Sequence, residues 1–114
     1  FLVVEDDQLL REIYRDVFES RGAEVTEAIH GAVAFSLVQA NKYDVVFTDV
    51  RMPGGDGITL AKNIFNMSGK KPLVFICSGY NDLSIEEAQD LNIQKVFEKP
   101  FETNFLIREI AARL

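Results

Sequence analysis

Two patterns of apolar residues alternate along this chain: short continuous runs, and segments in which apolar residues recur every three or four positions. Short apolar runs at Phe1–Val4, Tyr43–Phe47 and Leu73–Cys77 are typical of buried strands, and the last is continuously apolar, as expected of a central strand. Between the first two runs, apolar residues from Leu10 to Phe18 recur every three or four positions, which predicts one face of a helix. Alternating strand and helix signals of this kind indicate βαβ units around a parallel sheet.

Weaker signals complete the pattern. Edge strands are predicted at 24–28, where polar and apolar residues alternate, and at 95–98. Further helices are predicted at 31–40, at 57–66, after the capping-box spacing of Ser84–Glu87, and at the end of the sequence. The helical residues predicted to face inward are Leu10, Ile13, Tyr14, Val17, Phe18, Ile58, Ala61, Ile64, Phe65, Ile107, Ile110, Ala111 and Leu114. The sum is a (βα)₅ repeat in one domain over residues 1–114.

Four residues are predicted to mark helix ends. Asp7 and Asp56 carry the short acidic side chain that favours the start of a helix. Gly22 is predicted to end the first helix, and Asn92 is predicted to end the fourth in a left-handed conformation. These signals agree with the helix boundaries that the apolar periodicity predicts.

Composition and charge narrow the class of protein. With 114 residues and 47% hydrophobic residues, the chain has enough apolar content for one core. It has no apolar run of membrane-spanning length and no signal peptide, and its single cysteine fits a reducing compartment, so a cytoplasmic location is expected. The net charge of −6 argues against nucleic-acid binding by this domain. Because the sequence opens on a strand-like run, we expect that preceding residues have been omitted.

Acidic residues follow two of the predicted strands directly. Glu5, Asp6 and Asp7 come after the first strand, and Asp49 comes after the third. Neighbouring parallel strands lie about 5 Å apart, so these acids are expected to converge on one pocket. Two carboxylates about 4 Å apart repel by about 4 kcal/mol at an effective dielectric constant of roughly 20, so three call for a cation. Oxygen ligands favour Mg²⁺, with Mn²⁺ as an expected substitute.

Two further strand ends carry groups that suit a phosphoryl ligand. Ser78 and Gly79 follow the fourth strand and offer a hydroxyl and an unhindered backbone N–H, while Lys99 follows the fifth and offers a cation. Each of these residues alone is better read as a turn residue or a solvated charge. Together with Asp49 and the acids after the first strand, they place polar groups at four strand ends, where ligands of open α/β sheets bind.

The motifs at these strand ends resemble those of a known family. Val3–Asp7, Asp49–Pro53, Ser78–Tyr80 and Lys99–Phe101 are similar, in order and over essentially the whole chain, to the receiver domain of two-component response regulators. The resemblance implies a flavodoxin-like doubly wound sheet with strand order 2-1-3-4-5. It further implies a phosphoacceptor switch rather than an enzyme, with only self-directed phosphoryl transfer and autodephosphorylation.

The resemblance also implies a role for each matching residue. Asp49 is expected to be the nucleophile that becomes an aspartyl phosphate. The expected ligands of Mg²⁺ are Asp6, Asp49, Glu5 through water, and the backbone carbonyl of Arg51. Ser78, the Gly79 amide and Lys99 are expected to contact phosphoryl oxygens, and the Lys99–Pro100 peptide is expected to be cis.

The same resemblance implies partners. The phosphoryl donor is expected to be the phosphohistidine of a sensor kinase or a phosphotransfer protein, and the switch is expected to control an output domain or a downstream protein. The domain is expected to be a monomer or a phosphorylation-dependent dimer. Gln94 and Lys95 stand where the winged-helix subfamily carries acids for its dimer salt bridges, which makes that dimer mode less expected.

One departure from the family keeps a second hypothesis open. The position three before Lys99 is usually aromatic in such switches, but here it is Val96, and Phe97 is predicted to point to the opposite face of its strand. A pseudo-receiver, which keeps the fold for protein interactions without phosphoryl transfer, is the alternative. A small flavodoxin-like enzyme or nucleotide binder is a third class, but no Gly-rich phosphate loop follows the first strand.

Overall fold

The computed structural model describes residues 1–52, 56–79 and 85–114. Its strands are β1 (Leu2–Val4), β2 (Thr26–Ala28), β3 (Val45–Asp49), β4 (Leu73–Ser78) and β5 (Ile93–Glu98). Its helices are α1 (Gln8–Glu19), α2 (Gly31–Ala40), α3 (Gly57–Phe65), α4 (Ile85–Asp90) and α5 (Thr103–Ala111). The expected motif residues Pro53 and Tyr80 and the capping-box residue Ser84 lie outside the described residues.

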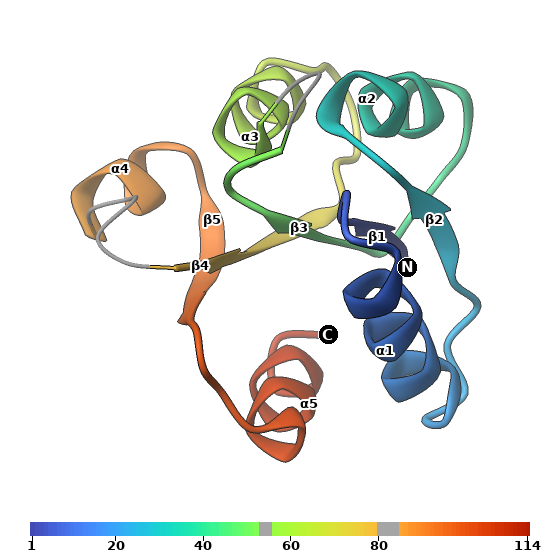
Figure 1. The fold of residues 1–114 in the computed structure, drawn as a ribbon. Helices are drawn as coiled ribbons and strands as arrows, with labels where there is room; N and C mark the ends of the chain where they lie inside the picture. The colour runs from blue at the N-terminus through green and yellow to red at the C-terminus, as the bar shows by residue number, and fades with distance from the viewer. Residues whose placement is uncertain (53–55, 80–84) are drawn as a thin grey trace.

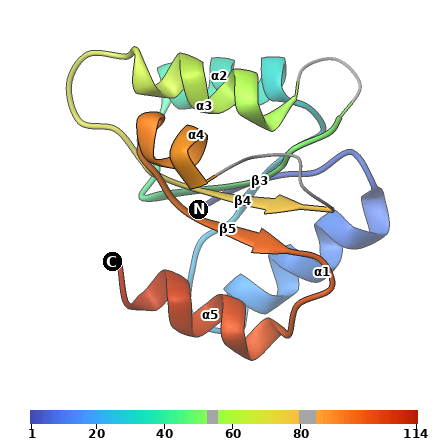
Figure 2. The ribbon, with the colours of Figure 1, turned by 90° about the vertical axis from the view of Figure 1, so that its left-hand side faces the viewer.

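All strand pairs are parallel, and the strands lie in the order β2-β1-β3-β4-β5. The predicted flavodoxin-like order is therefore confirmed. Helices α2, α3 and α4 cover one face of the sheet, while α1 and α5 cover the other (Figure 1 and Figure 2). With both faces covered, the central strands are buried along most of their length, which explains their continuous apolar runs.

The two faces of the sheet are packed with different side chains. Under α2, α3 and α4 the buried residues are mostly aliphatic, among them Val46, Leu60 and Ile76. Under α1 and α5 the core is rich in rings, among them Tyr14 and Phe97. Because strand residues alternate between faces, neighbours in one strand contribute to different cores.

The predicted helix ends are present. Asp7 accepts a hydrogen bond from the Leu10 N–H at 3.1 Å, and Asp56 accepts one from the Thr59 N–H at 2.7 Å. These bonds satisfy N–H groups that the first turn of a helix leaves without partners. Asn92 adopts a positive φ of 56° after α4, as predicted.

Four of the residues predicted to face inward from helices are exposed. Leu114 is 67% exposed and lies beyond the end of α5, and the preceding inward candidate, Ala111, is also exposed. Ile13 and Phe65 are each 41% exposed, although both were expected to face inward. In α1 and α3 the predicted apolar stripe is thus wider than the strip that the sheet covers, so residues at its margin remain partly in solvent.

Strand β5 also begins two residues earlier than predicted. A register shift between Val74 and Phe75 allows Ile93 to pair with Val74 and Lys95 with Phe75. Among the described residues, no helix has the length and apolar content needed to cross a bilayer.

Candidate functional site

Three acids meet at the carboxyl ends of β1 and β3. Glu5 follows β1 directly, Asp49 is the last residue of β3, and the pairing of Val4 with Thr48 brings these two strand ends side by side. Carboxylate oxygens of Glu5, Asp6 and Asp49 all lie within 4.8 Å of one another. The convergence expected from the sequence is therefore present in the fold.

Glu5 is the most unusual member of this group. It is 1% exposed, and its Oε1 atom has no hydrogen-bond partner among the described residues, while Oε2 accepts a bond from the Asp7 N–H at 3.3 Å. Burial, followed by the neighbouring carboxyl groups of Asp6 and Asp49, raises the pKa of Glu5 to about 7, against the opposite effects of the Asp7 N–H and Lys99. A buried carboxylate oxygen that has no partner among the described residues and lies close to two further carboxylates fits a hard divalent cation such as Mg²⁺.

Asp49 is held by a donor at each of its two oxygens. The Val50 N–H donates to Oδ1 at 2.8 Å, and the Lys99 ammonium donates to Oδ2 at 3.1 Å. The side chains of Asp49 and Lys99 are 14% and 31% exposed. The carboxylate is therefore fixed in orientation while it stays within reach of solvent.

Lys99 reaches Asp49 from the end of β5. Its backbone N–H donates to the Ser78 carbonyl at 2.8 Å, which ties the end of β5 to β4. Burial disfavours the ammonium charge, but Cys77, Asp49 and Glu5 outweigh this effect, so the pKa of Lys99 is raised. The Lys99–Pro100 peptide is cis, as the resemblance led us to expect.

The remaining expected site residues stand at or just after the ends of β3 and β4. Ser78 ends β4 one position after Cys77, the residue that pairs with Asp49, and its side chain is only 2% exposed. Gly79 and Arg51 follow their strands and are exposed. The structure thus brings Asp49 and Lys99 into contact and buries Ser78 at the end of the neighbouring strand.

Two residues that support the site were not predicted from the sequence. A Cβ atom on Gly57 would lie 2.1 Å from the Asp49 carbonyl oxygen, so α3 can begin against this backbone only with glycine. The Arg11 guanidinium donates to the Glu5 carbonyl at 2.9 Å from α1. The sequence predicts only a helix start at Gly57, and no local signal marks Arg11, because its partner lies on another element.

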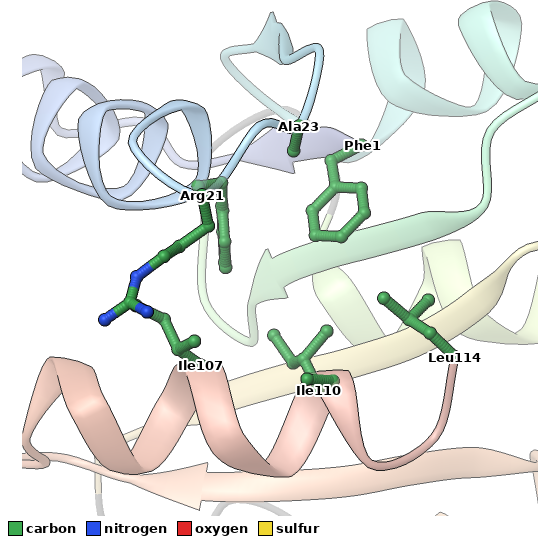
Figure 3. Close-up of a pocket in the computed structure, with 8 residues that line it drawn as sticks. Phe1, Arg21, Ala23, Ile107, Ile110 and Leu114 are labelled. Atoms are coloured by element: carbon green, nitrogen blue, oxygen red, sulfur yellow. The ribbon is translucent and has the colours of Figure 1, made fainter.

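A separate apolar pocket lies at the other end of the sheet. It has a volume of about 140 Å³ and is lined by Phe1, Phe18, Arg21, Ala23, Ile107, Ile110, Ala111 and Leu114. Figure 3 shows Ile107, Ile110 and Leu114 from the C-terminal segment facing Phe1 and Ala23. The acidic group is therefore not part of this pocket.

Comparison with known proteins agrees with this geometry. The profile of the response regulator receiver domain family matches residues 1–111. The chain is 30% identical over 102 residues to Sporulation initiation phosphotransferase F of Bacillus subtilis (strain 168), covering 89% of this chain and 82% of that protein. It is 31% identical over 114 residues to Response regulator receiver protein CpdR of Brucella abortus (strain 2308), covering 99% and 94%.

Relatives of greater length and solved structures extend this picture. The chain is 30% identical to Regulator of RpoS of Escherichia coli (strain K12), with 96% of this chain covering 32% of that protein. Its fold matches the Francisella response regulator 1452 receiver domain with a TM-score of 0.84 and 32% identity, covering 96% of this chain and 92% of that one. Sequence and fold thus lead to the same assignment, and the chain belongs to the response regulator receiver domains of two-component systems.

Proposed function

We propose that this chain is a phosphoacceptor switch in which Asp49 takes a phosphoryl group from the phosphohistidine of a sensor kinase or a phosphotransfer protein. The observation that carries this proposal is the position of Asp49 between two further acids and the Lys99 ammonium, which lies 3.1 Å from Oδ2. Carboxylates gathered for a cation, next to a lysine, suit phosphoryl transfer, in which positioning and charge stabilisation provide most of the catalysis.

The proposed transfer is a direct displacement at phosphorus. A carboxylate oxygen of Asp49 forms a bond to phosphorus as the P–N bond of the donor breaks, and the electron pair of that bond stays on the imidazole nitrogen. The bonds from Val50 N–H and Lys99 hold the carboxylate in one orientation before the donor arrives. The Lys99 ammonium then stabilises the negative charge on the phosphoryl oxygens.

The proposed metal ligands are the carboxylates of Asp6 and Asp49, Glu5 through water, and the carbonyl of Arg51. When bound, Mg²⁺ supplies positive charge that offsets the charge of the transferring group, and Mn²⁺ can take its place. Glu5 and Asp6 supply the negative charge that makes the pocket favourable for a divalent ion. The buried Oε1 of Glu5, which has no hydrogen-bond partner within the described part of the chain, supports this assignment.

Ser78, the Gly79 amide and Lys99 are proposed to hold the phosphoryl oxygens once Asp49 is modified. Ser78 is 2% exposed and ends β4. Contact between its hydroxyl and the new group would shift the end of β4 between two pre-existing arrangements and would pass the signal to an output domain or a downstream protein. Loss of the phosphoryl group to water, within the same site, would reset the switch.

The proposed assembly is a domain covering residues 1–114 that acts as a monomer or dimerises on phosphorylation. Lys95 of β5 pairs with Glu109 of α5 in the same chain at 3.4 Å. Lys95 therefore already has an acidic partner within its own chain.

Chemical phosphorylation tests the proposal. Incubation with acetyl phosphate and Mg²⁺ is expected to add one phosphoryl group to Asp49, detected by intact mass and by peptide mapping after borohydride trapping. The variant D49N should gain none. A matched control is D44N, which changes an exposed acid at the opposite end of the same strand and should react like wild type. Equal labelling of wild type and D49N, or none in wild type while a known receiver domain reacts, would contradict the proposal.

Val96 favours a second candidate, a pseudo-receiver. Val96 packs against the aliphatic core on the α4 side, while Phe97 is 1% exposed in the aromatic core on the other face, as predicted. A ring that rotates at position 96 is therefore lacking. The two candidates differ in their response to Mg²⁺, because a receiver gains thermal stability as the ion binds and a pseudo-receiver does not.

A further inference from the structure

Arg11 connects three elements around the acidic group. Its side chain is 14% exposed and extends from α1 toward the ends of β1 and β2. One guanidinium nitrogen, Nη1, donates to the Glu5 backbone carbonyl at 2.9 Å, and Nε donates to Oε1 of Glu27 on β2 at 3.1 Å. The function proposed above assigns no role to Arg11 or to Glu27.

Both backbone groups of Glu5 are held by hydrogen bonds. The Glu5 N–H donates to the Ala28 carbonyl of β2 at 3.0 Å, and the Glu5 carbonyl accepts from Arg11. The carbonyl belongs to the peptide group that joins Glu5 to Asp6. The side chains of both residues are attached to the Cα atoms on either side of this group, so its orientation affects where both carboxylates lie. A planar guanidinium can hold two acceptors in fixed directions at once, which a lysine ammonium does less well.

Glu27 balances the positive charge that Arg11 brings close to the acidic group. An uncompensated arginine beside the acids would lower their attraction for a divalent cation. Glu27 pairs with Arg11 through Oε1 and with Arg15 through Oε2, at 3.1 Å and 3.2 Å. The charge of Arg11 is therefore balanced on the β2 side, and its Nη1 contact is made with a neutral carbonyl.

We propose that Arg11 is a positioning residue for the cation site: it orients the Glu5–Asp6 peptide, while Glu27 neutralises its charge. This inference rests on the cation site of the proposed function. Residues that do not bind the metal but orient its ligands typically lower metal affinity by about 10–100-fold when they are removed. Loss of the Arg11 bond is therefore expected to weaken cation binding without altering any ligand.

The chain offers a matched control in Arg15. Arg15 lies one turn further along α1, binds the same Glu27 and has additional ion pairs with Asp16 and Glu19. It has no hydrogen bond to the Glu5 backbone among those of the described residues. Replacing Arg15 by methionine removes a surface ion-pair network of similar size and keeps an unbranched apolar stem.

The experiment compares Mn²⁺ affinity, measured by electron paramagnetic resonance, in wild type, R11M, R15M and R11K, with thermal unfolding in chelator recorded for each. R11M is expected to weaken Mn²⁺ binding by about tenfold or more. R15M is expected to stay within about twofold of wild type even where its melting temperature falls as far as that of R11M. R11K, which keeps the charge and can replace only one of the two bonds, is expected to lie between them.

Each outcome decides the question. Mn²⁺ affinity of R11M within twofold of wild type, or an equal loss in R15M, would overturn the positioning role. If R11M does not fold, R11K takes its place, and wild-type affinity in R11K overturns the proposal. If wild type does not bind Mn²⁺, the proposed cation site itself is wrong. This outcome differs from one in which wild type binds Mn²⁺ and R11M binds it equally well, which would contradict only the role of Arg11.

Discussion

Strand β3 passes through two regions that differ in what their side chains do. From Val45 to Phe47 the strand is at most 1% exposed and is surrounded by apolar residues of both cores. Two residues later, Asp49 lies within 4.8 Å of two other carboxylates, one of which is buried. The interior lowers the free energy of the folded state, whereas the strand ends raise it by holding like charges together.

The geometry of the site therefore depends on the packing of the residues that surround it. Asp49, Glu5 and Lys99 come from three different strands, and each position is set by sheet pairing and core packing beneath it. Substitutions in the interior should therefore cost stability, and substitutions at the strand ends should cost cation binding while they preserve or increase stability.

The largest effect is expected in the interior. The variant F97A removes a ring that is 1% exposed and contacts the rings of Phe47, Phe75, Phe101 and Phe105 at centroid distances of 5.7–6.3 Å. It is expected to lower the free energy of unfolding by about 3–5 kcal/mol, measured by urea denaturation. F105A, at a position 36% exposed, is the control and should cost less than half as much. Equal losses would show that the aromatic core is not centred on Phe97.

Gly57 joins the two regions, and its substitution should affect both. In G57A the new methyl group meets the Asp49 carbonyl oxygen at 2.1 Å, a backbone atom that cannot move away without shifting the carboxylate. We expect a loss of about 1–3 kcal/mol in unfolding free energy, together with weaker Mn²⁺ binding. G69A is the control, because Gly69 has a positive φ of 82° but, among the residues that the structure describes, no atom lies within 4 Å of its new methyl group. G69A should lower the free energy of unfolding but leave Mn²⁺ affinity unchanged. Unchanged Mn²⁺ affinity in G57A would contradict the proposed link between packing at Gly57 and the position of the Asp49 carboxylate.

At the strand ends the sign of the effect should reverse. D6N removes one charge from the acidic group and keeps a side chain that can hydrogen-bond to Glu5. In the presence of chelator it is expected to raise the free energy of unfolding by about 1 kcal/mol, while Mn²⁺ binding is lost. D44N, at the other end of β3, should change neither quantity appreciably. A lower melting temperature for D6N in chelator would argue against charge crowding.

The smallest effect concerns pH. The folded-state pKa of Glu5 is raised from 4.5 to about 7, so its contribution to apo stability is complete below pH 4.5 and is lost as the pH rises to about 7. A bound cation requires the ionised form, so the increase in melting temperature caused by Mg²⁺ should be small at pH 6 and larger at pH 8. E5Q should remove this pH dependence. A Mg²⁺ effect of equal size at both pH values would contradict it.

Much of the fold could be predicted because its signals are local. The apolar runs, the helical periodicity and the capping residues Asp7 and Asp56 each depend on neighbours within a few positions, and strand order followed from the family resemblance. Element margins were predicted less well. Ile13 and Phe65 differ from the prediction because exposure depends on how far the sheet extends beneath the helix, which the helix sequence does not contain.

For the candidate site, the chemical groups at the strand ends and the opposite orientations of Val96 and Phe97 could be predicted from the sequence. The folded chain was needed to show that Glu5 is buried with an oxygen that has no partner among the described residues, that Gly57 must lack a side chain, and that Arg11 holds the Glu5 carbonyl. The two kinds of feature depend on interactions of different range. Alternation along a strand is set by the local backbone, whereas burial and contact arise between residues that only folding brings together.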